Sequence, residues 1–127
     1  MKKQNFDFKD KTILIVDDIE DCYSLLDLIL KRVEVNTIWA KNGLEAIKVC
    51  KDNDQIDLAL MDIRMPKMNG YDACIKIKEL RPDLPIIIQS SYEVDYEKHK
   101  VKDAGFEEYI SKPINREKLL RLLQTYL

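Results

Sequence analysis

Short runs of apolar residues alternate with segments of helical periodicity along this 127-residue chain. The runs at 12–16 and 56–62 are of the kind found in strands buried on both faces of a sheet, whereas those at 35–40 and 107–110 also contain polar residues. The runs span residues 12–16, 35–40, 56–62, 84–91 and 107–110. Strands that alternate with helices predict an α/β fold, in which a parallel sheet is covered by helices on both sides.

Helix signals fill the segments between these runs. The first helix is expected to end near Arg32, and its apolar stripe consists of Cys22, Leu25, Leu26 and Ile29. A polar fourth helix is expected over residues 92–105, and Asn115 is placed to cap a last helix. No composition shift divides the chain, so we expect one domain over residues 11–127, preceded by an N-terminal extension, residues 1–10.

Composition excludes several classes of protein. A net charge of −2 gives no bulk attraction to nucleic acid. No apolar run approaches the roughly 20 residues that span a bilayer, and the charged first eleven residues do not resemble a signal peptide. The three cysteines lack C-x-x-C spacing, so we expect packing roles for them, neither zinc binding nor redox chemistry. A cytoplasmic domain is expected.

Reactive side chains follow four of the five predicted strands. Asp17 and Asp18 follow the first strand, Asp62 ends the third, Ser90 ends the fourth and Lys112 follows the fifth. The carboxyl ends of parallel strands meet at one edge of the sheet, where ligands of such folds bind. We therefore expect these five side chains to form one site.

The charges at this edge favour a divalent cation. Three carboxylates carry about −3, which one divalent ion and the Lys112 ammonium would neutralise. Oxygen ligands without histidine select Mg²⁺ (or Mn²⁺) over zinc. A different role for Asp18 or Asp21 is to cap the helix that follows.

Four motifs give the chain a family resemblance. They are VDD at 16–18, MDIRMPKMNG at 61–70, the hydroxyl that ends PIIIQSS at 85–91, and YISKP at 109–113. In this order they resemble the response-regulator receiver domain of two-component signalling, including the chemotaxis receivers. The resemblance implies a flavodoxin-like, doubly wound (βα)5 fold with five parallel strands in the order 2-1-3-4-5.

The resemblance also implies roles for the acidic residues. Asp62 would be the phosphorylated nucleophile, which accepts a phosphoryl group from a sensor-kinase phosphohistidine and also contacts the metal. Asp18 would ligate Mg²⁺ directly, Asp17 would hold it mainly through water, and the backbone carbonyl of Arg64 would be a further ligand. Lys112 would neutralise a phosphoryl oxygen, in line with the charge that develops in phosphoryl transfer.

A second group of residues would bind the phosphoryl group and switch the domain. Ser90 would hydrogen-bond the new phosphoryl group, and Tyr109 matches an aromatic that turns inward in response. The Lys112–Pro113 peptide bond matches one that is cis in the family. Gln89 departs from the pattern, because the family usually has an apolar residue there.

The resemblance implies a phosphoacceptor that catalyses only its own phosphotransfer and slow autodephosphorylation. The expected partners are a sensor histidine kinase or phosphotransfer domain, and a downstream protein on the surface formed by the fourth helix, fifth strand and last helix. A homodimer stays open, and neither nucleic acid nor membrane is expected to bind. The chain is either a stand-alone regulator or the receiver of a larger protein such as a hybrid sensor kinase.

Three rival functions remain as alternatives. A haloacid-dehalogenase-type phosphatase needs an Asp two residues after its nucleophile, where this chain has Arg64. A flavin-binding flavodoxin needs a neutral first loop for its phosphate, which the acidic stretch DDIED would repel. A degenerate receiver would bind partners without being phosphorylated, and the complete set of site residues argues against it.

Overall fold

The computed structural model describes residues 7–90 and 104–127. Its strands are β1 (Thr12–Val16), β2 (Asn36–Ala40), β3 (Leu58–Asp62), β4 (Ile86–Ser90) and β5 (Glu108–Ser111). Its helices are α1 (Glu20–Lys31), α2 (Gly43–Asp52), α3 (Gly70–Leu80) and α5 (Arg116–Tyr126). The helix expected over residues 92–105 lies almost entirely outside the described residues.

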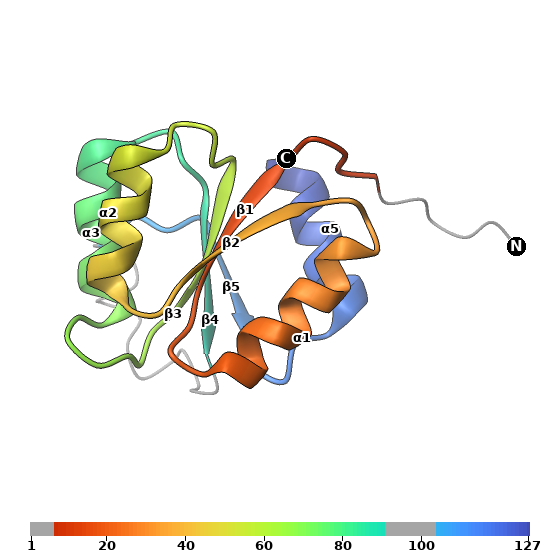
Figure 1. The fold of residues 1–127 in the computed structure, drawn as a ribbon, viewed down its shortest axis with the longest axis horizontal. Helices are drawn as coiled ribbons and strands as arrows, with labels where there is room; N and C mark the ends of the chain where they lie inside the picture. The colour runs from red at the N-terminus through yellow and green to blue at the C-terminus, as the bar shows by residue number, and fades with distance from the viewer. Residues whose placement is uncertain (1–6, 91–103) are drawn as a thin grey trace, which may run out of the picture.

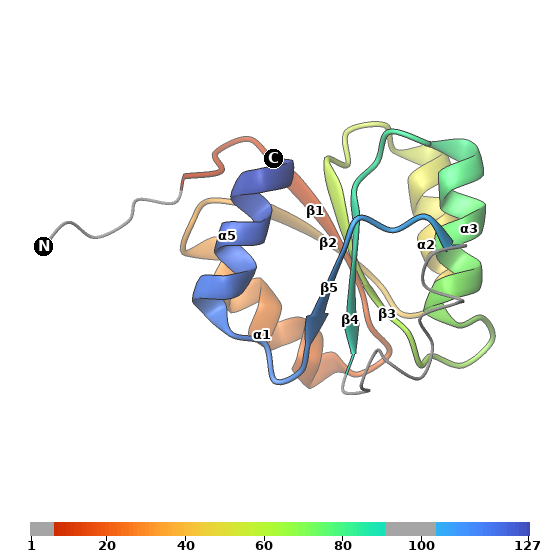
Figure 2. The same cartoon turned by 180° about the vertical axis from the view of Figure 1, so that it is seen from behind.

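The five strands form one parallel sheet in the order β2-β1-β3-β4-β5, which confirms the predicted fold class. Helices α2 and α3 cover one face, and α1 and α5 cover the other (Figure 1, and from behind in Figure 2). The register pairs Val16 with Ala40, Asp62 with Gln89 and Ser90 with Ser111. The carboxyl ends of the strands are therefore level, and the loops that follow them share one edge.

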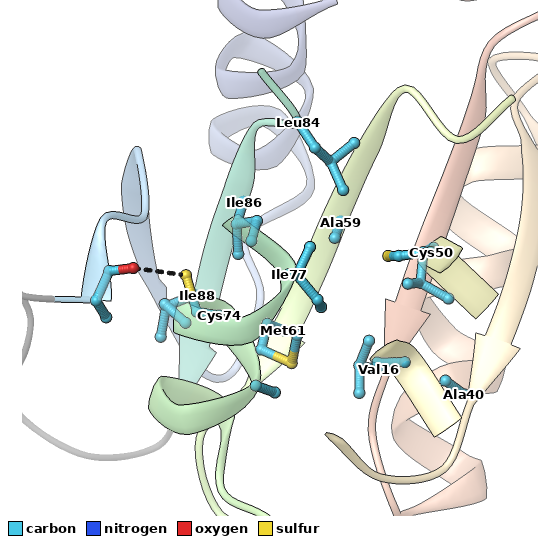
Figure 3. Packing of buried hydrophobic residues seen from close by; sticks show 14 of the residues in the cluster. Val16, Ala40, Cys50, Ala59, Met61, Cys74, Ile77, Leu84, Ile86 and Ile88 are labelled. Carbon is cyan, nitrogen blue, oxygen red and sulfur yellow. Dashed lines mark hydrogen bonds between the residues drawn. The ribbon is translucent and has the colours of Figure 1, made fainter. Parts of the chain in front are cut away.

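Alternation along the strands divides the apolar interior into two clusters. In β4, Ile86 and Ile88 belong to the cluster under α2 and α3, and Ile87 belongs to the cluster under α1 and α5. Figure 3 shows part of the first cluster, in which the Cys74 thiol donates to the Ala104 carbonyl at 3.3 Å. All residues of β3 and β4 are buried, as the continuous apolar runs predict.

The predicted stripe of the first helix is wrong by one residue. The buried residues of α1 are Leu26, Ile29 and Leu30, whereas Leu25 is 50% exposed. Both sets follow the i, i+3, i+4 spacing of a helix, so the sequence alone permits either face. The helix ends at Lys31, as expected.

Two smaller predictions are confirmed. The Asn115 side chain caps α5 by accepting a hydrogen bond from the Lys118 N–H at 3.0 Å. All three cysteines are free: Cys50 and Cys74 are buried, and Cys22 is half-buried. Within the described part of the chain, no helix has the length and apolar character needed to cross a membrane.

Candidate phosphoacceptor and metal site

The carboxyl edge of the sheet brings together four charged side chains. Asp17 and Asp18 directly follow β1, Asp62 is the last residue of β3, and Lys112 directly follows β5. Carboxylate oxygens of the three aspartates lie within 4.8 Å of one another. The Lys112 Nζ lies 3.0 Å from Asp17 Oδ2 and 3.4 Å from Asp62 Oδ2, so one ammonium bridges two carboxylates.

Burial sets the electrostatics of this group. Asp17 is fully buried and Asp62 is 6% exposed, whereas Asp18 is exposed. Burial raises the pKa of Asp62 from its ordinary 3.8 to about 6, and Asp17 adds to the rise, while Lys112 and the Ile63 N–H oppose it. Burial disfavours the Lys112 ammonium, but the hydrogen bond to Asp17 and the charge of Asp62 outweigh it, so the pKa of Lys112 is raised.

The donor set fits a hard divalent cation. Three carboxylates and one ammonium leave a net charge of −2, and every donor in the cluster is an oxygen. The exposed Asp18 also lines a cavity of about 490 Å³ together with residues of the loop after β3, including Arg64 and Asn69. The cluster is therefore open on one side, toward this cavity.

The loops on either side of the cluster hold its two buried carboxylates in place. The Asp17 Oδ1 accepts a hydrogen bond from the Ile19 N–H at 3.0 Å, and the Asp62 Oδ1 accepts one from the Ile63 N–H at 2.8 Å. Ile19 is the N-cap residue of α1 and makes no side-chain cap, so neither Asp18 nor Asp21 caps this helix. That alternative is wrong.

The return of the chain to α3 requires a glycine beside Asp62. The Gly70 N–H donates to the Ile63 carbonyl at 2.8 Å, which closes the loop between β3 and α3. A Cβ at position 70 would overlap the Asp62 carbonyl oxygen, so no other residue fits without moving the backbone. Lys67 in the same loop has a φ of 72°, in the region that favours glycine.

Trp39 is a site neighbour that the sequence reasoning missed. Its indole N–H donates to the Asp17 backbone carbonyl at 2.8 Å, and its ring stacks on Tyr23 with centroids 4.6 Å apart. The sequence did contain an indication of this position, because Trp39 lies near the carboxyl end of β2, and β2 pairs with β1, the strand that precedes Asp17.

The remaining candidate residues lie around the same edge. Ser90 is buried at the end of β4, and its carbonyl accepts a hydrogen bond from the Lys112 N–H at 2.8 Å. Tyr109 is half-buried in β5 and packs against the apolar cluster under α2 and α3. Alternate residues of a strand point to the same face of the sheet, so the Ser90 side chain points to this face as well. Arg64 is exposed, and the Lys112–Pro113 peptide bond is cis.

The sequence matches the family model of the response regulator receiver domain over residues 13–124. The polar-differentiation response regulator DivK of Brucella anthropi is 31% identical over 120 residues, covering 92% of this chain and 96% of DivK. The autoinducer 1 sensor kinase/phosphatase LuxN of Vibrio campbellii is 48% identical over 79 residues. That match covers 62% of this chain but only 9% of LuxN, so the chain spans a small part of this relative.

Solved structures show the same fold. The chemotaxis protein CheY4 of Vibrio cholerae superposes with a TM-score of 0.86 at 24% identity, over 92% of this chain and 98% of CheY4. The receiver domain of the sensor histidine kinase PA1611 of Pseudomonas aeruginosa superposes with a TM-score of 0.84 at 25% identity, over 91% of this chain and 96% of that domain. That receiver was solved with a magnesium ion coordinated in its active-site cleft.

Proposed function

The chain belongs to the response regulator receiver domain family of two-component signalling, and on this premise we propose that Asp62 accepts a phosphoryl group from a phosphohistidine in a Mg²⁺-dependent reaction. The observation that carries the proposal is the position of the Lys112 ammonium, 3.0 Å from Asp17 and 3.4 Å from Asp62, beside three clustered carboxylates. A fixed cation at the reacting oxygen is what phosphoryl transfer needs.

In the transfer, a carboxylate oxygen of Asp62 forms the new O–P bond as the P–N bond of the phosphohistidine breaks. The imidazole leaves with the electron pair of that bond and then takes up a proton. The Ile63 N–H holds Oδ1 at 2.8 Å, which leaves Oδ2 beside Lys112 as the reacting oxygen. Lys112 then stays paired with the added negative charge.

The residues that would hold the metal are Asp18 directly, Asp17 mainly through water, Asp62, and the backbone carbonyl of Arg64. When bound, Mg²⁺ (or Mn²⁺) would neutralise charge on the phosphoryl oxygens. Support comes from the all-oxygen donor set and from the magnesium ion bound by the similar PA1611 receiver domain. The exposure of Asp18 fits an ion that keeps several waters.

Phosphorylation adds about one negative charge at this edge. We assign to the Ser90 hydroxyl the hydrogen bond to the phosphoryl group, and to Tyr109 the inward turn that passes the change to β5. The downstream partner would bind the surface that includes β5 and α5, and a sensor histidine kinase or phosphotransfer domain would supply the phosphoryl group. Residues 11–127 would form this cytoplasmic domain, and residues 1–10 an extension to it.

The two similar proteins point to different parent proteins for such a domain. LuxN is named as a sensor kinase/phosphatase, which corresponds to a receiver within a larger chain. DivK is named as a response regulator, and the match covers 96% of its length, which corresponds to a stand-alone regulator. The proposed chemistry is the same in both.

The test is incubation with acetyl phosphate and Mg²⁺, followed by intact-mass measurement. The parent chain should gain one phosphoryl group, and Asp62→Asn should gain none. Asp21→Asn is the matched control, because it removes an exposed carboxylate from the first turn of α1 and should leave the adduct unchanged. An unmodified parent, or an adduct that persists in Asp62→Asn, would contradict the proposal. Omission of Mg²⁺ with added EDTA should prevent the adduct.

A further inference from the structure

A second cavity lies behind the phosphoacceptor site, between the start of α1 and the loop after β5. This loop runs beside α1 in both views of the fold (Figures 1 and 2). The cavity has a volume of about 330 Å³, at the lower end of the range for small-molecule sites. Its walls include Leu25 and Leu26 from α1, and Pro113 and Ile114 from the loop. Its lining is therefore largely aliphatic.

Gln89, whose side-chain amide is buried, also lines this cavity. Gln89 is 1% exposed, and neither its Oε1 nor its Nε2 has a hydrogen-bond partner among residues 7–90 and 104–127. Alternation along β4 places Gln89 on the sheet face of Ile87, which packs under α1 and α5. A buried amide without partners is costly, whereas an apolar residue of the same size would be satisfied here. The amide therefore indicates a ligand that supplies the missing hydrogen bonds.

The charges around the cavity select a neutral ligand. Lys112 also lines it, but its ammonium already pairs with Asp17 and Asp62. A carboxylate ligand would compete with these two aspartates for the ammonium, and a cationic ligand would place a second positive charge beside it. A primary carboxamide or a lactam carries no charge and offers one donor and one acceptor on the same side, which match the Oε1 and Nε2 of Gln89.

We propose that this cavity is a binding site for a small neutral carboxamide or lactam, whose amide pairs with Gln89 and whose apolar body packs on Leu25, Pro113 and Ile114. Both polar atoms of the Gln89 side chain are buried, so binding of the ligand would include a rotation of this amide into the cavity. The site lies beyond the phosphoacceptor function and needs neither the metal nor phosphorylation.

The test is a titration of the ¹⁵N-labelled chain with benzamide, followed by amide chemical shifts in the absence of Mg²⁺ and phosphodonor. Saturable shifts should centre on Leu25, Gln89 and Ile114, with a dissociation constant on the order of 1 mM. Gln89→Leu and Gln89→Met keep the volume and remove the amide, so each should weaken binding at least about tenfold. N,N-dimethylbenzamide, which has no N–H, should bind the parent chain about as weakly as benzamide binds these variants.

A second readout uses the thiol on the cavity wall. Cys22 lines the cavity and is the only one of the three cysteines that is not buried. Benzamide should therefore slow the reaction of Cys22 with a thiol reagent in the parent chain but not in Gln89→Leu. Equal binding of benzamide to the parent and the two Gln89 variants would overturn the proposal, as would shifts that do not saturate or that centre elsewhere. Because no phosphodonor is present, the result is independent of the Asp62 phosphorylation test.

Discussion

Replacing Asp62 with Asn should stabilise the metal-free protein while it abolishes phosphorylation. Asp62 is 6% exposed and shares the Lys112 ammonium with Asp17, so two buried carboxylates are balanced by one positive charge. The Asp62→Asn substitution removes the less well-compensated carboxylate and keeps the shorter, 3.0 Å pair of Lys112 and Asp17. The remaining pair is neutral.

The magnitude follows from the pKa of Asp62. Burial raises this pKa from 3.8 to about 6, so the folded state binds the proton more tightly than the unfolded state does. Ionised Asp62 therefore costs stability at pH 7, and this cost disappears as the pH falls below about 4. A shift of this size corresponds to at most about 3 kcal/mol. Screening by water at the sheet edge lowers the expected gain in Asp62→Asn to about 1–3 kcal/mol.

The assay is urea unfolding of the parent and of Asp62→Asn in EDTA, followed by circular dichroism between pH 4 and pH 8. The difference in the free energy of unfolding should favour the variant at pH 7 and approach zero near pH 4. Adding Mg²⁺ should stabilise the parent and have less effect on the variant, because a ligand that binds the folded state raises its stability. A variant that is less stable than the parent at pH 7, or a difference that does not change with pH, would refute this reasoning.

Three further substitutions test the supports of the site. Gly70→Ala forces a Cβ against the Asp62 carbonyl, so urea unfolding should show that the free energy of unfolding falls by about 3 kcal/mol. An unchanged free energy of unfolding would mean that the loop shifts freely to make room. Trp39→Phe removes the hydrogen bond to the Asp17 carbonyl but keeps an aromatic ring. Calorimetry should show Mg²⁺ binding weakened about fivefold, whereas unchanged affinity would exclude a positioning role. Lys67→Gly relieves the strain of a lysine at a φ of 72°, so thermal unfolding should show a stability gain of about 0.5–1 kcal/mol. A loss of stability in this variant would show that the Lys67 backbone is not strained.

The sequence predicted the parts of the fold that depend on period and order. Short runs rich in apolar residues identified the strands, and their parallel arrangement put Asp17, Asp62 and Lys112 at one edge before any distance was known. The buried face of α1 was misplaced, because Leu25 and Leu26 both fit a helical stripe and only the packing of the helix decides between them.

Contacts between distant side chains could not be predicted in the same way. The hydrogen bond from Trp39 to the Asp17 carbonyl joins two strands through one side-chain rotamer, which periodicity does not determine. The requirement for Gly70 arises from the close return of the loop to the Asp62 carbonyl, a distance that exists only in the folded chain. The isolated amide of Gln89 was visible in the sequence only as a polar residue in an apolar run, without any sign of the cavity beside it.

The hydrogen bond of Trp39 has a practical consequence for experiments on this protein. Trp39 is the only tryptophan in the chain, so all of the indole emission comes from this one position. Its N–H is bound to the backbone of Asp17, and that residue is also ion-paired with Lys112. A rearrangement at the site therefore reaches the chromophore through a single hydrogen bond. Loading and release of the site can be followed in real time by stopped-flow fluorescence on the unlabelled, unmodified chain.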